Sequence, residues 1–196
     1  MLRKIRDSLL ILYAKLLAKG VFAPEYLRGR WFERDGRSIT TGWRWVIRAS
    51  RARKRFGANT DTPWPVSMFS FVTGAANISF HPDDLNDFQN MGCYFQGIGK
   101  ITIGRGTYIA ANVGIITANH SFENLDAHDE AKPVFIGERC WIGMNSVILP
   151  GVTLGDRTIV GAGSIVTRSF PEGGCVIAGN PAKLIRKIAE PDTEAL

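Results

Sequence analysis

The sequence predicts an all-β solenoid in which each coil is built from three short strands. The first observation is an aliphatic residue at every sixth position, in two blocks: Ile103, Ile109 and Ile115, then Ile136, Ile142, Ile148, Leu154, Val160 and Val166. The second observation is a glycine directly after five of them, at positions 104, 137, 143, 155 and 161. A helix repeats its faces about every 3.6 residues and a simple amphipathic strand about every two, so neither explains this pattern.

A period of six fits three flat strands per coil, each contributing one inward aliphatic side chain. Stacked coils then bury a continuous apolar column. Glycine suits the corners between strands, where the backbone adopts conformations that a Cβ atom resists. We expect this architecture over residues 69–178, with its clearest repeats between 97 and 170.

The register is interrupted once, between Ile116 and Val134. This polar stretch includes Asn119, His120 and His128 and ends at Lys132-Pro133. An insertion in a regular solenoid maps to a loop on one face, which is often the binding face. We therefore expect an extruded loop here.

The segments outside the repeats predict three further features. Residues 2–19 read as an amphipathic helix, because Ile5, Leu9, Leu12, Leu16 and Leu17 recur at helical spacing. Residues 20–68 read as irregular and rich in tryptophan and arginine, which gives a division into 1–68, 69–178 and 179–196. After a turn at Gly179-Asn180-Pro181, residues 182–188 read as a short basic helix, and Pro191–Leu196 as a disordered tail.

The charge is distributed unevenly along the chain. Residues 1–56 contain 15 Lys and Arg against 4 Asp and Glu, whereas residues 57–196 contain 9 against 14. Such asymmetry indicates either an anionic partner or a solvated face. A basic amphipathic helix is also typical of contact with a lipid surface, which we expect as one use of residues 2–19. No recognised nucleic-acid module accompanies the arginines between 44 and 55, and we expect no nucleic acid as partner.

The cysteines and the N-terminus predict the compartment. Cys93, Cys140 and Cys175 are odd in number and lie among apolar residues, which favours free buried thiols in a reducing compartment. The apolar run from Leu9 to Ala14 is far shorter than the roughly 20 residues that span a bilayer. We expect a cytoplasmic protein, with peripheral contact to the inner face of the cytoplasmic membrane as a further expectation.

From the repeats onward the sequence resembles the hexapeptide-repeat acyltransferases, and most of all the galactoside and maltose acetyltransferases among the sugar O-acetyltransferases. Several segments over roughly residues 90–188 match this family: Thr117-Ala118-Asn119-His120, Lys132-Pro133, Cys140-Trp141-Ile142-Gly143, Val147–Val152, Gly161–Thr167 and Gly179–Ala182, with Lys183 and Arg186 after them. The first ninety residues match poorly. The resemblance implies a left-handed β-helix, a homotrimer and active sites in the clefts between subunits.

The resemblance also implies acetyl transfer from acetyl-CoA to a hydroxyl, without a metal, with His120 as general base. An imidazole that titrates near neutrality takes the hydroxyl proton and returns it to the leaving thiolate. Its second ring nitrogen needs a partner, and the sequence leaves this open among Glu123, Asp126, Asp129, Glu130 and a backbone carbonyl.

The remaining site residues follow from matched positions. Those expected to bind acetyl-CoA are Trp141, Gly143, Met144, Ala162, Gly163, Thr167, Arg168, Lys183 and Arg186, the basic ones because they suit the phosphates of coenzyme A. Asn90 and Asn112 are the expected contacts to the acceptor. The acceptor itself is expected to be a sugar, a polysaccharide precursor or a lipid-linked saccharide.

Three alternatives compete with this interpretation. A γ-type carbonic anhydrase uses the same solenoid, but the spacing of His81, His120 and His128 does not match the zinc triad of that family. A non-catalytic, membrane-associated scaffold would use residues 1–56 to bind an anionic partner. An acetyltransferase for a small non-sugar acceptor, such as an antibiotic or an amino acid, is the third.

Overall fold

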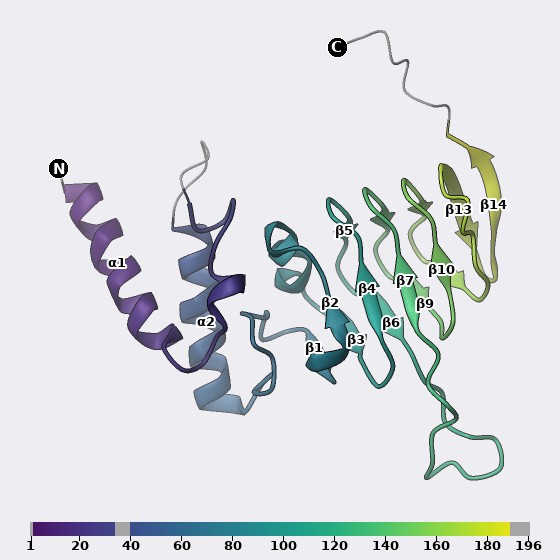
Figure 1. Ribbon diagram of the computed structural model, residues 1–196, viewed down its shortest axis with the longest axis horizontal. Coiled ribbons are helices and arrows are strands. Elements are labelled where there is room, and N and C mark those ends of the chain that lie inside the picture. The colour runs from purple at the N-terminus through teal and green to yellow at the C-terminus, as the bar shows by residue number, and fades with distance from the viewer. Residues whose placement is uncertain (1, 34–39, 189–196) are drawn as a thin grey trace, which may run out of the picture.

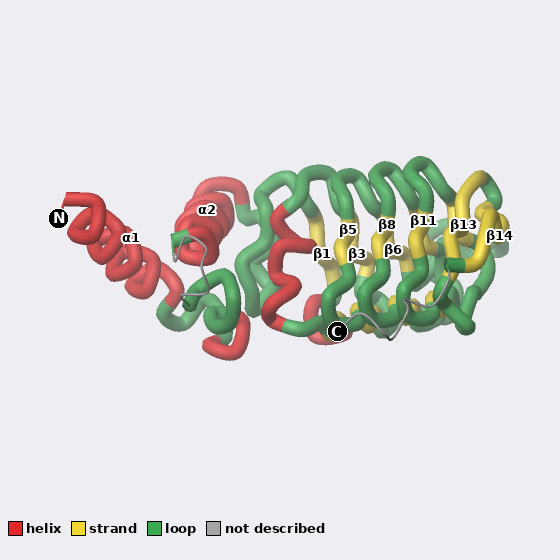
Figure 2. The backbone as a smooth tube through the Cα atoms, turned by 90° about the horizontal axis from the view of Figure 1, so that it is seen from above, coloured by secondary structure: helices red, strands yellow, loops and turns green. Residues whose placement is uncertain are grey.

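The computed structural model describes residues 2–33 and 40–188. Two α-helices come first, α1 (Leu2–Ala18) and α2 (Thr41–Phe56), which pack against each other. The strands begin with β1 (Phe71–Thr73). Figures 1 and 2 show the two helices at one end of an elongated body and the stacked coils along the rest of it. No helix within the described residues is long and apolar enough to cross a lipid bilayer.

The coils form three sheets that run along the body, here called sheets A, B and C. Sheet A has the order β1, β3 (Tyr94–Gln96), β6 (Gly114–Ile116), β9 (Val147–Ile148) and β12 (Ile165–Val166). Sheet B has the order β10 (Thr153–Leu154), β7 (Val134–Ile136), β4 (Ile101–Ile103) and β2 (Ile78–Ser79). Sheet C has the order β14 (Ala182–Lys187), β13 (Cys175–Gly179), β11 (Ile159–Val160), β8 (Trp141–Ile142) and β5 (Tyr108–Ile109). Short 3₁₀ helices, η1 (Pro24–Tyr26), η2 (Ala75–Asn77) and η3 (Pro82–Gln89), complete the elements.

The period of six is the register of these sheets. Ile136 pairs with Leu154 on sheet B, Ile142 with Val160 on sheet C, and Ile148 with Val166 on sheet A, all in parallel. The nine periodic aliphatic residues are all between 0% and 3% exposed. The predicted parallel β-helix and its inward column are therefore confirmed, while its left-handed sense remains what the resemblance implies.

The predicted class, all-β, describes the coils but not the whole chain, because residues before 71 are partly helical. The helix predicted over residues 2–19 is confirmed as α1. The prediction that residues 20–68 are irregular is wrong, because α2 lies within them. Trp43, Val46 and Ala49 are buried at helical spacing, and Gly57 ends α2 in the left-handed conformation at φ 65°.

The predicted C-terminal helix over residues 182–188 is also wrong. Residues 182–187 form β14, which pairs in antiparallel fashion with β13. A helix there would leave the edge of β13 with unpaired N–H and C=O groups, and β14 satisfies them. Residues 189–196, including the predicted tail, lie outside the described part of the chain, and the division at residues 68 and 178 remains a prediction.

The three sheets form the sides of a prism, and two of its corners contain most of the predicted site residues. At the C–A corner the chain passes from sheet C to sheet A, and at the A–B corner it passes from sheet A to sheet B. The C–A corner contains one left-handed residue in each of four successive coils: Gly92, Asn112, Asn145 and Gly163, with φ of 73°, 58°, 61° and 71°. This explains why glycine and asparagine occupy these positions.

Candidate active site

The loop between β6 and β7 leaves the body at the A–B corner, as predicted. Figure 1 shows it projecting well away from the coils. Its base is held by Gln96, whose side-chain oxygen accepts hydrogen bonds from the backbone N–H groups of Thr117 and Ala118 at 3.0 and 2.8 Å. The Thr117 carbonyl in turn accepts from the N–H of Lys132 at 2.7 Å, which joins the two strands of the loop. Since Gln96, Thr117 and Ala118 are buried, the loop starts from a fixed base.

His120 lies just beyond this base, and the structure supplies the partner that the sequence left open. The Leu125 carbonyl oxygen is 2.7 Å from Nδ1 of His120. A carbonyl oxygen only accepts hydrogen bonds, so Nδ1 carries the hydrogen and Nε2 of the neutral ring keeps its lone pair. The ring of His128 lies 4.4 Å away from that of His120, centroid to centroid, and the two residues face each other across the loop as a β-bridge. His120 is therefore an exposed imidazole with a fixed tautomer.

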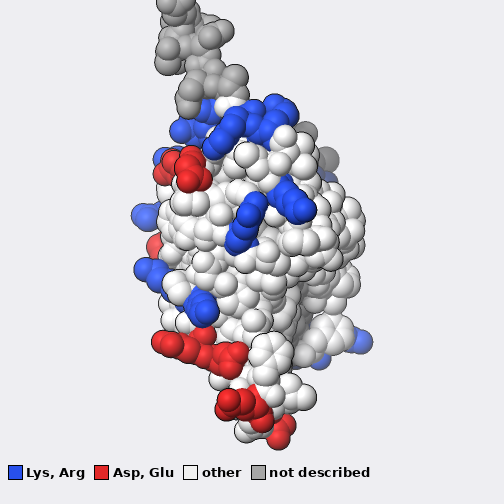
Figure 3. All heavy atoms as spheres, turned by 90° about the vertical axis from the view of Figure 1, so that its right-hand side faces the viewer, with Lys and Arg blue, Asp and Glu red and all other residues white. Residues whose placement is uncertain are grey.

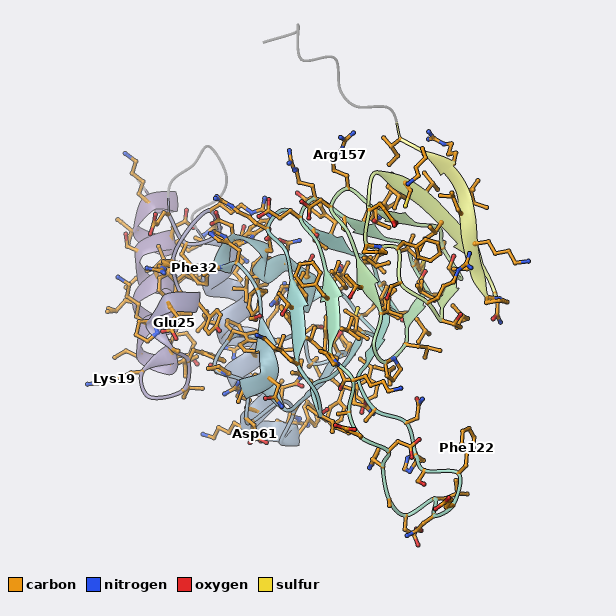
Figure 4. The ribbon with its side chains drawn as sticks, turned by 45° about the vertical axis from the view of Figure 1, so that its right-hand side comes forward. Lys19, Glu25, Phe32, Asp61, Phe122 and Arg157 are labelled. Atoms are coloured by element: carbon orange, nitrogen blue, oxygen red, sulfur yellow. The ribbon has the colours of Figure 1, made fainter. Side chains whose placement is uncertain are left out.

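The tip of the loop carries two exposed apolar side chains among polar ones. Phe122 is 97% exposed and Leu125 is 71% exposed. Figure 4 shows Phe122 on the projecting loop with its side chain pointing outward from the loop. A large aromatic side chain in this position has no partner within the described residues of one chain.

The C–A corner brings together four of the residues that the sequence predicts for acetyl-CoA: Gly143, Met144, Ala162 and Gly163. The backbone N–H of Gly163 donates to the Met144 carbonyl at 2.8 Å. A Cβ atom on Gly143 would lie 2.6 Å from the Ala162 nitrogen, so the two coils meet with no room for a side chain. Met144, Ala162 and Gly163 are exposed and Gly143 is buried, so this corner presents an exposed strip with a methionine on one coil and two small residues on the next.

Trp141 lies on the neighbouring face. It is on β8, in register between Tyr108 of β5 and Ile159 of β11, and its side chain points outward and is 55% exposed. It therefore flanks the exposed strip at Met144, Ala162 and Gly163 and offers a flat apolar surface beside it.

Thr167 and the basic residues predicted for acetyl-CoA are divided between two places. Thr167 and Arg168 follow β12 and so lie at the A–B corner, where Arg168 packs over the ring of Phe170 at 5.3 Å. Lys183 and Arg186 are exposed on β14 at the end of sheet C. Figure 3 shows this end of the molecule, with Lys and Arg side chains gathered toward one side and Asp and Glu side chains at the opposite, projecting part.

The two predicted acceptor residues lie at the start of the C–A corner. The Asn90 side chain donates to the Ile109 carbonyl, and the backbone N–H of Asn112 donates to the Met91 carbonyl at 2.9 Å. The backbone of Asn112 is in the left-handed conformation at this corner, and this conformation alone explains why an asparagine occupies the position. Asn90 also lines a cavity of about 600 Å³ together with Trp45, Arg48, Met91 and Ala111.

Trp45 and Arg48 are cavity residues that the sequence analysis missed as site residues. They come from α2, which the sequence analysis read as irregular. The signal was present as apolar residues at helical spacing between the arginines, and an assignment of that stretch as a helix would have placed one face on the body.

Three acidic residues near this end hold the coils together. Asp84 accepts from the backbone N–H of Gly106 at 2.8 Å, and Asp87 accepts from that of Ile109 at 3.1 Å. Asp83 pairs with Arg105 at 3.2 Å. Burial raises the pKa of Asp84 and holds the pKa of Asp87 well above its ordinary value. Asp84 and Asp87 therefore bind the backbone of the first coils, and Asp83 binds a side chain of the same coils.

Comparison with known proteins agrees with this geometry. Residues 133–168 match the family described as bacterial transferase hexapeptide (six repeats). Residues 133–168 are therefore hexapeptide repeats of the kind found in this family. The repeat resemblance drawn from the sequence is therefore confirmed, and the repeats are those of the coils from β7 to β12.

The chain is also similar to curated proteins. One is a Saccharomyces cerevisiae protein named "Putative acetyltransferase", which is 46% identical over 111 residues, or 55% of this chain and 56% of the relative. Another, of the same name, is from Staphylococcus aureus strain Mu50, with 40% identity over 106 residues and 53% of each chain. The chain spans about half the length of the curated relatives it matches.

Two solved structures share the fold over nearly the whole chain. A maltose O-acetyltransferase from Clostridium difficile 630 is 26% identical, with a TM-score of 0.51 over 94% of this chain and 89% of that one. A galactoside acetyltransferase in complex with coenzyme A is 23% identical, with a TM-score of 0.52 over 93% and 82%. The second likeness supports the fold alone.

Proposed function

We propose that this protein is an acetyl-CoA-dependent O-acetyltransferase that uses His120 as its general base. The observation that carries the proposal is the hydrogen bond from Nδ1 of His120 to the Leu125 carbonyl, which leaves Nε2 free on an exposed loop. The match of residues 133–168 to the transferase hexapeptide repeats supports the reaction class. The similarity to a maltose O-acetyltransferase supports an acetyl group as the cargo and a saccharide hydroxyl as the acceptor.

The chemistry follows from the tautomer. Nε2 takes the proton of the acceptor hydroxyl while its oxygen attacks the thioester carbonyl carbon. The tetrahedral intermediate then collapses, the carbon–sulfur bond breaks, and the imidazolium returns the proton to the thiolate of coenzyme A. The Leu125 carbonyl supports both steps, because it stabilises the positive charge that forms on the ring and keeps the ring oriented.

We propose that two copies of the chain complete each site. His120 is at the A–B corner, whereas Met144, Ala162 and Asn90 are at the C–A corner, with sheet A between them. A neighbouring copy in a homotrimer brings the loop of one chain to the C–A corner of the next. The exposed Phe122 and Leu125 then pack against that neighbour.

Acetyl-CoA fits along this corner. The small exposed residues Ala162 and Gly163 let the pantetheine arm approach the backbone, Gly143 lets the two coils meet closely beneath them, and Trp141 flanks this strip. The backbone N–H of Met144 is a donor for the oxyanion of the tetrahedral intermediate. Thr167, Arg168, Lys183 and Arg186 contribute hydroxyl and positive groups for the phosphates, from this chain or its neighbour.

We place the enzyme in the cytoplasm, because its three cysteines are free and buried, as in reducing compartments. The exposed apolar face of α1 supports peripheral contact with the inner face of the membrane.

The experiment is release of free thiol from acetyl-CoA in the presence of maltose, galactosides, nucleotide sugars and lipid-linked saccharides. We expect turnover with at least one saccharide class and a loss of about 10²–10⁴-fold in His120→Ala. His81→Gln, a histidine variant on the body away from the loop, is the control and keeps its rate. Near-normal turnover of His120→Ala refutes the mechanism, and absence of acetyl-CoA binding to the wild type refutes the class.

A further inference from the structure

The helix α2 presents a row of four arginines to solvent. Arg44, Arg48, Arg51 and Arg55 are exposed and recur at spacings of four, three and four residues, which places them on one face. None of the ion pairs between described residues includes them. The helix itself contains no acidic residue. This is a concentrated positive surface without a described anionic partner.

Three of these arginines line a groove between the two helices. The groove has a volume of about 400 Å³ and is lined by Leu10 and Tyr13 of α1 and by Ile47 and the three arginines of α2: Arg44, Arg48 and Arg51. The Arg51 guanidinium lies 6.0 Å from the centroid of the Tyr13 ring. The groove therefore combines three guanidinium groups with an apolar wall.

Arg48 connects this groove to the cavity beside the proposed acceptor site. The same side chain lines the cavity of about 600 Å³ that contains Asn90 and Ala111. The Ala111 carbonyl accepts from the N–H of Asn145 at 3.2 Å, next to Met144. If the polar part of a molecule binds in this cavity, the next chemical group of that molecule lies against Arg48.

On its other side, the groove borders an apolar surface. Helix α1 has two apolar faces: Ala14 and Ala18 pack inward, whereas four large aliphatic residues face solvent. These are Ile5, Leu9, Leu12 and Leu16, which are 51%, 62%, 58% and 67% exposed. Tyr13, which is 44% exposed, lies between this outer stripe and the arginine groove.

We propose that the arginine groove binds the diphosphate of a lipid-linked saccharide acceptor. The saccharide occupies the cavity at Asn90, the diphosphate pairs with Arg44, Arg48 and Arg51, and the apolar tail lies along the outer stripe of α1. Guanidinium groups bind phosphate oxygens in bidentate fashion, which suits a diphosphate better than a single carboxylate. The inference rests on the proposed function for the identity of the acceptor, and it assigns this site to residues outside the acetyl-transfer centre.

The order of the three surfaces favours one molecule over other anions. A cavity with Asn90, Gln89 and Ser67 among mostly apolar lining residues, a cationic groove and an apolar face follow one another through Arg48 and Tyr13. A free sugar nucleotide would use the first two only, and an anionic bilayer lipid would use the last two only.

The test is binding of farnesyl diphosphate to the full-length protein by isothermal titration calorimetry, with inorganic pyrophosphate and farnesol as probes for the two halves. We expect farnesyl diphosphate to bind at least tenfold more tightly than either half. Arg48→Gln weakens it by roughly tenfold or more, the usual effect of losing one charge-assisted pair. Arg55→Gln removes an equal charge from the same row but outside the groove and the cavity, and it leaves binding within about twofold.

Several outcomes overturn the inference. Equal losses in Arg48→Gln and Arg55→Gln mean general attraction to a basic helix. Equal affinity for pyrophosphate and farnesyl diphosphate, or tighter binding of UDP-glucose, shows that the lipid tail is not part of the ligand. Dissociation of the oligomer in Leu9→Ser/Leu12→Ser, measured by light scattering, assigns the stripe to a sister subunit instead. A protein that binds acetyl-CoA but not farnesyl diphosphate refutes this inference and leaves the proposed function standing.

Discussion

Replacement of Gln96 by leucine tests how the body positions His120. The substitution keeps the approximate size of the side chain and removes the oxygen that accepts from the N–H groups of Thr117 and Ala118 at 3.0 and 2.8 Å. Both residues are buried, at 0% and 3% exposure, so neither N–H gains water without movement. An unsatisfied buried donor costs about 1–3 kcal/mol, which gives a total of about 2–6 kcal/mol for the pair.

We expect this cost to appear as opening of the loop base before the coils unfold, because the loop projects away from them. Hydrogen exchange over residues 117–133 should accelerate by at least about thirtyfold, the equivalent of 2 kcal/mol. Acetyl transfer should fall by about 10²-fold, because a small displacement of a catalytic group has effects of that size. Acetyl-CoA binding should be retained.

The matched control is Asn77→Ala. This amide lies near the same coil and donates to the Gly97 and Ile98 carbonyls at 2.9 and 3.2 Å, but it does not contact the loop. It should lower overall stability without changing exchange in residues 117–133. If Gln96→Leu shows wild-type exchange in the loop, the argument that Gln96 fixes the loop base is wrong.

Three further predictions concern the coils. Ile142→Ala, in the fully buried column, should lower the free energy of unfolding, measured in urea, by about 2–5 kcal/mol. Ile98→Ala, at an exposed corner, should lower it by less than about 1 kcal/mol. Equal losses would contradict the conclusion that the buried column stabilises the coils. Gly173→Ala should destabilise the protein far more than Gly174→Ala in thermal unfolding. Both glycines have positive φ, but only a Cβ on Gly173 would lie 2.2 Å from a backbone oxygen, that of Asp156 in the preceding coil. Burial raises the pKa of Asp87, so the folded state keeps a proton that the unfolded chain has lost, and stability should fall as pH rises from the ordinary carboxyl range toward the folded pKa. Asp87→Asn should flatten that slope in urea titrations at several pH values, and an unchanged slope would show that Asp87 is not its source.

The coils could be predicted from the sequence because the same pattern of inward aliphatic residues repeats in each of them. Each of the residues Ile136, Ile142 and Ile148 sits in the same environment as its partner 18 residues later, so the period survives in the sequence. The extruded loop was predictable for the same reason, as a gap in the period. The family motifs then indicated His120.

The remaining features depend on contacts that have no period. Residues 182–187 read as a helix because their basic and apolar residues alternate irregularly, and only the open edge of β13 makes them a strand. The partner of His120 is a backbone carbonyl, which leaves no trace in the sequence. The cavity at Asn90 is closed by Trp45 and Arg48 of α2, so it could not be predicted without that helix and its packing.

The most direct test of the account is complementation between two inactive variants. His120→Ala lacks the base, and Ala162→Trp fills the proposed acetyl-CoA strip at the C–A corner. If each site takes its base from one copy and its strip from the next, random mixed trimers of the two variants contain intact sites at about one quarter of the positions. Co-produced variants should therefore recover about a quarter of wild-type thiol release, although each alone is inactive. Mixed oligomers that form but stay inactive would contradict a site shared between copies.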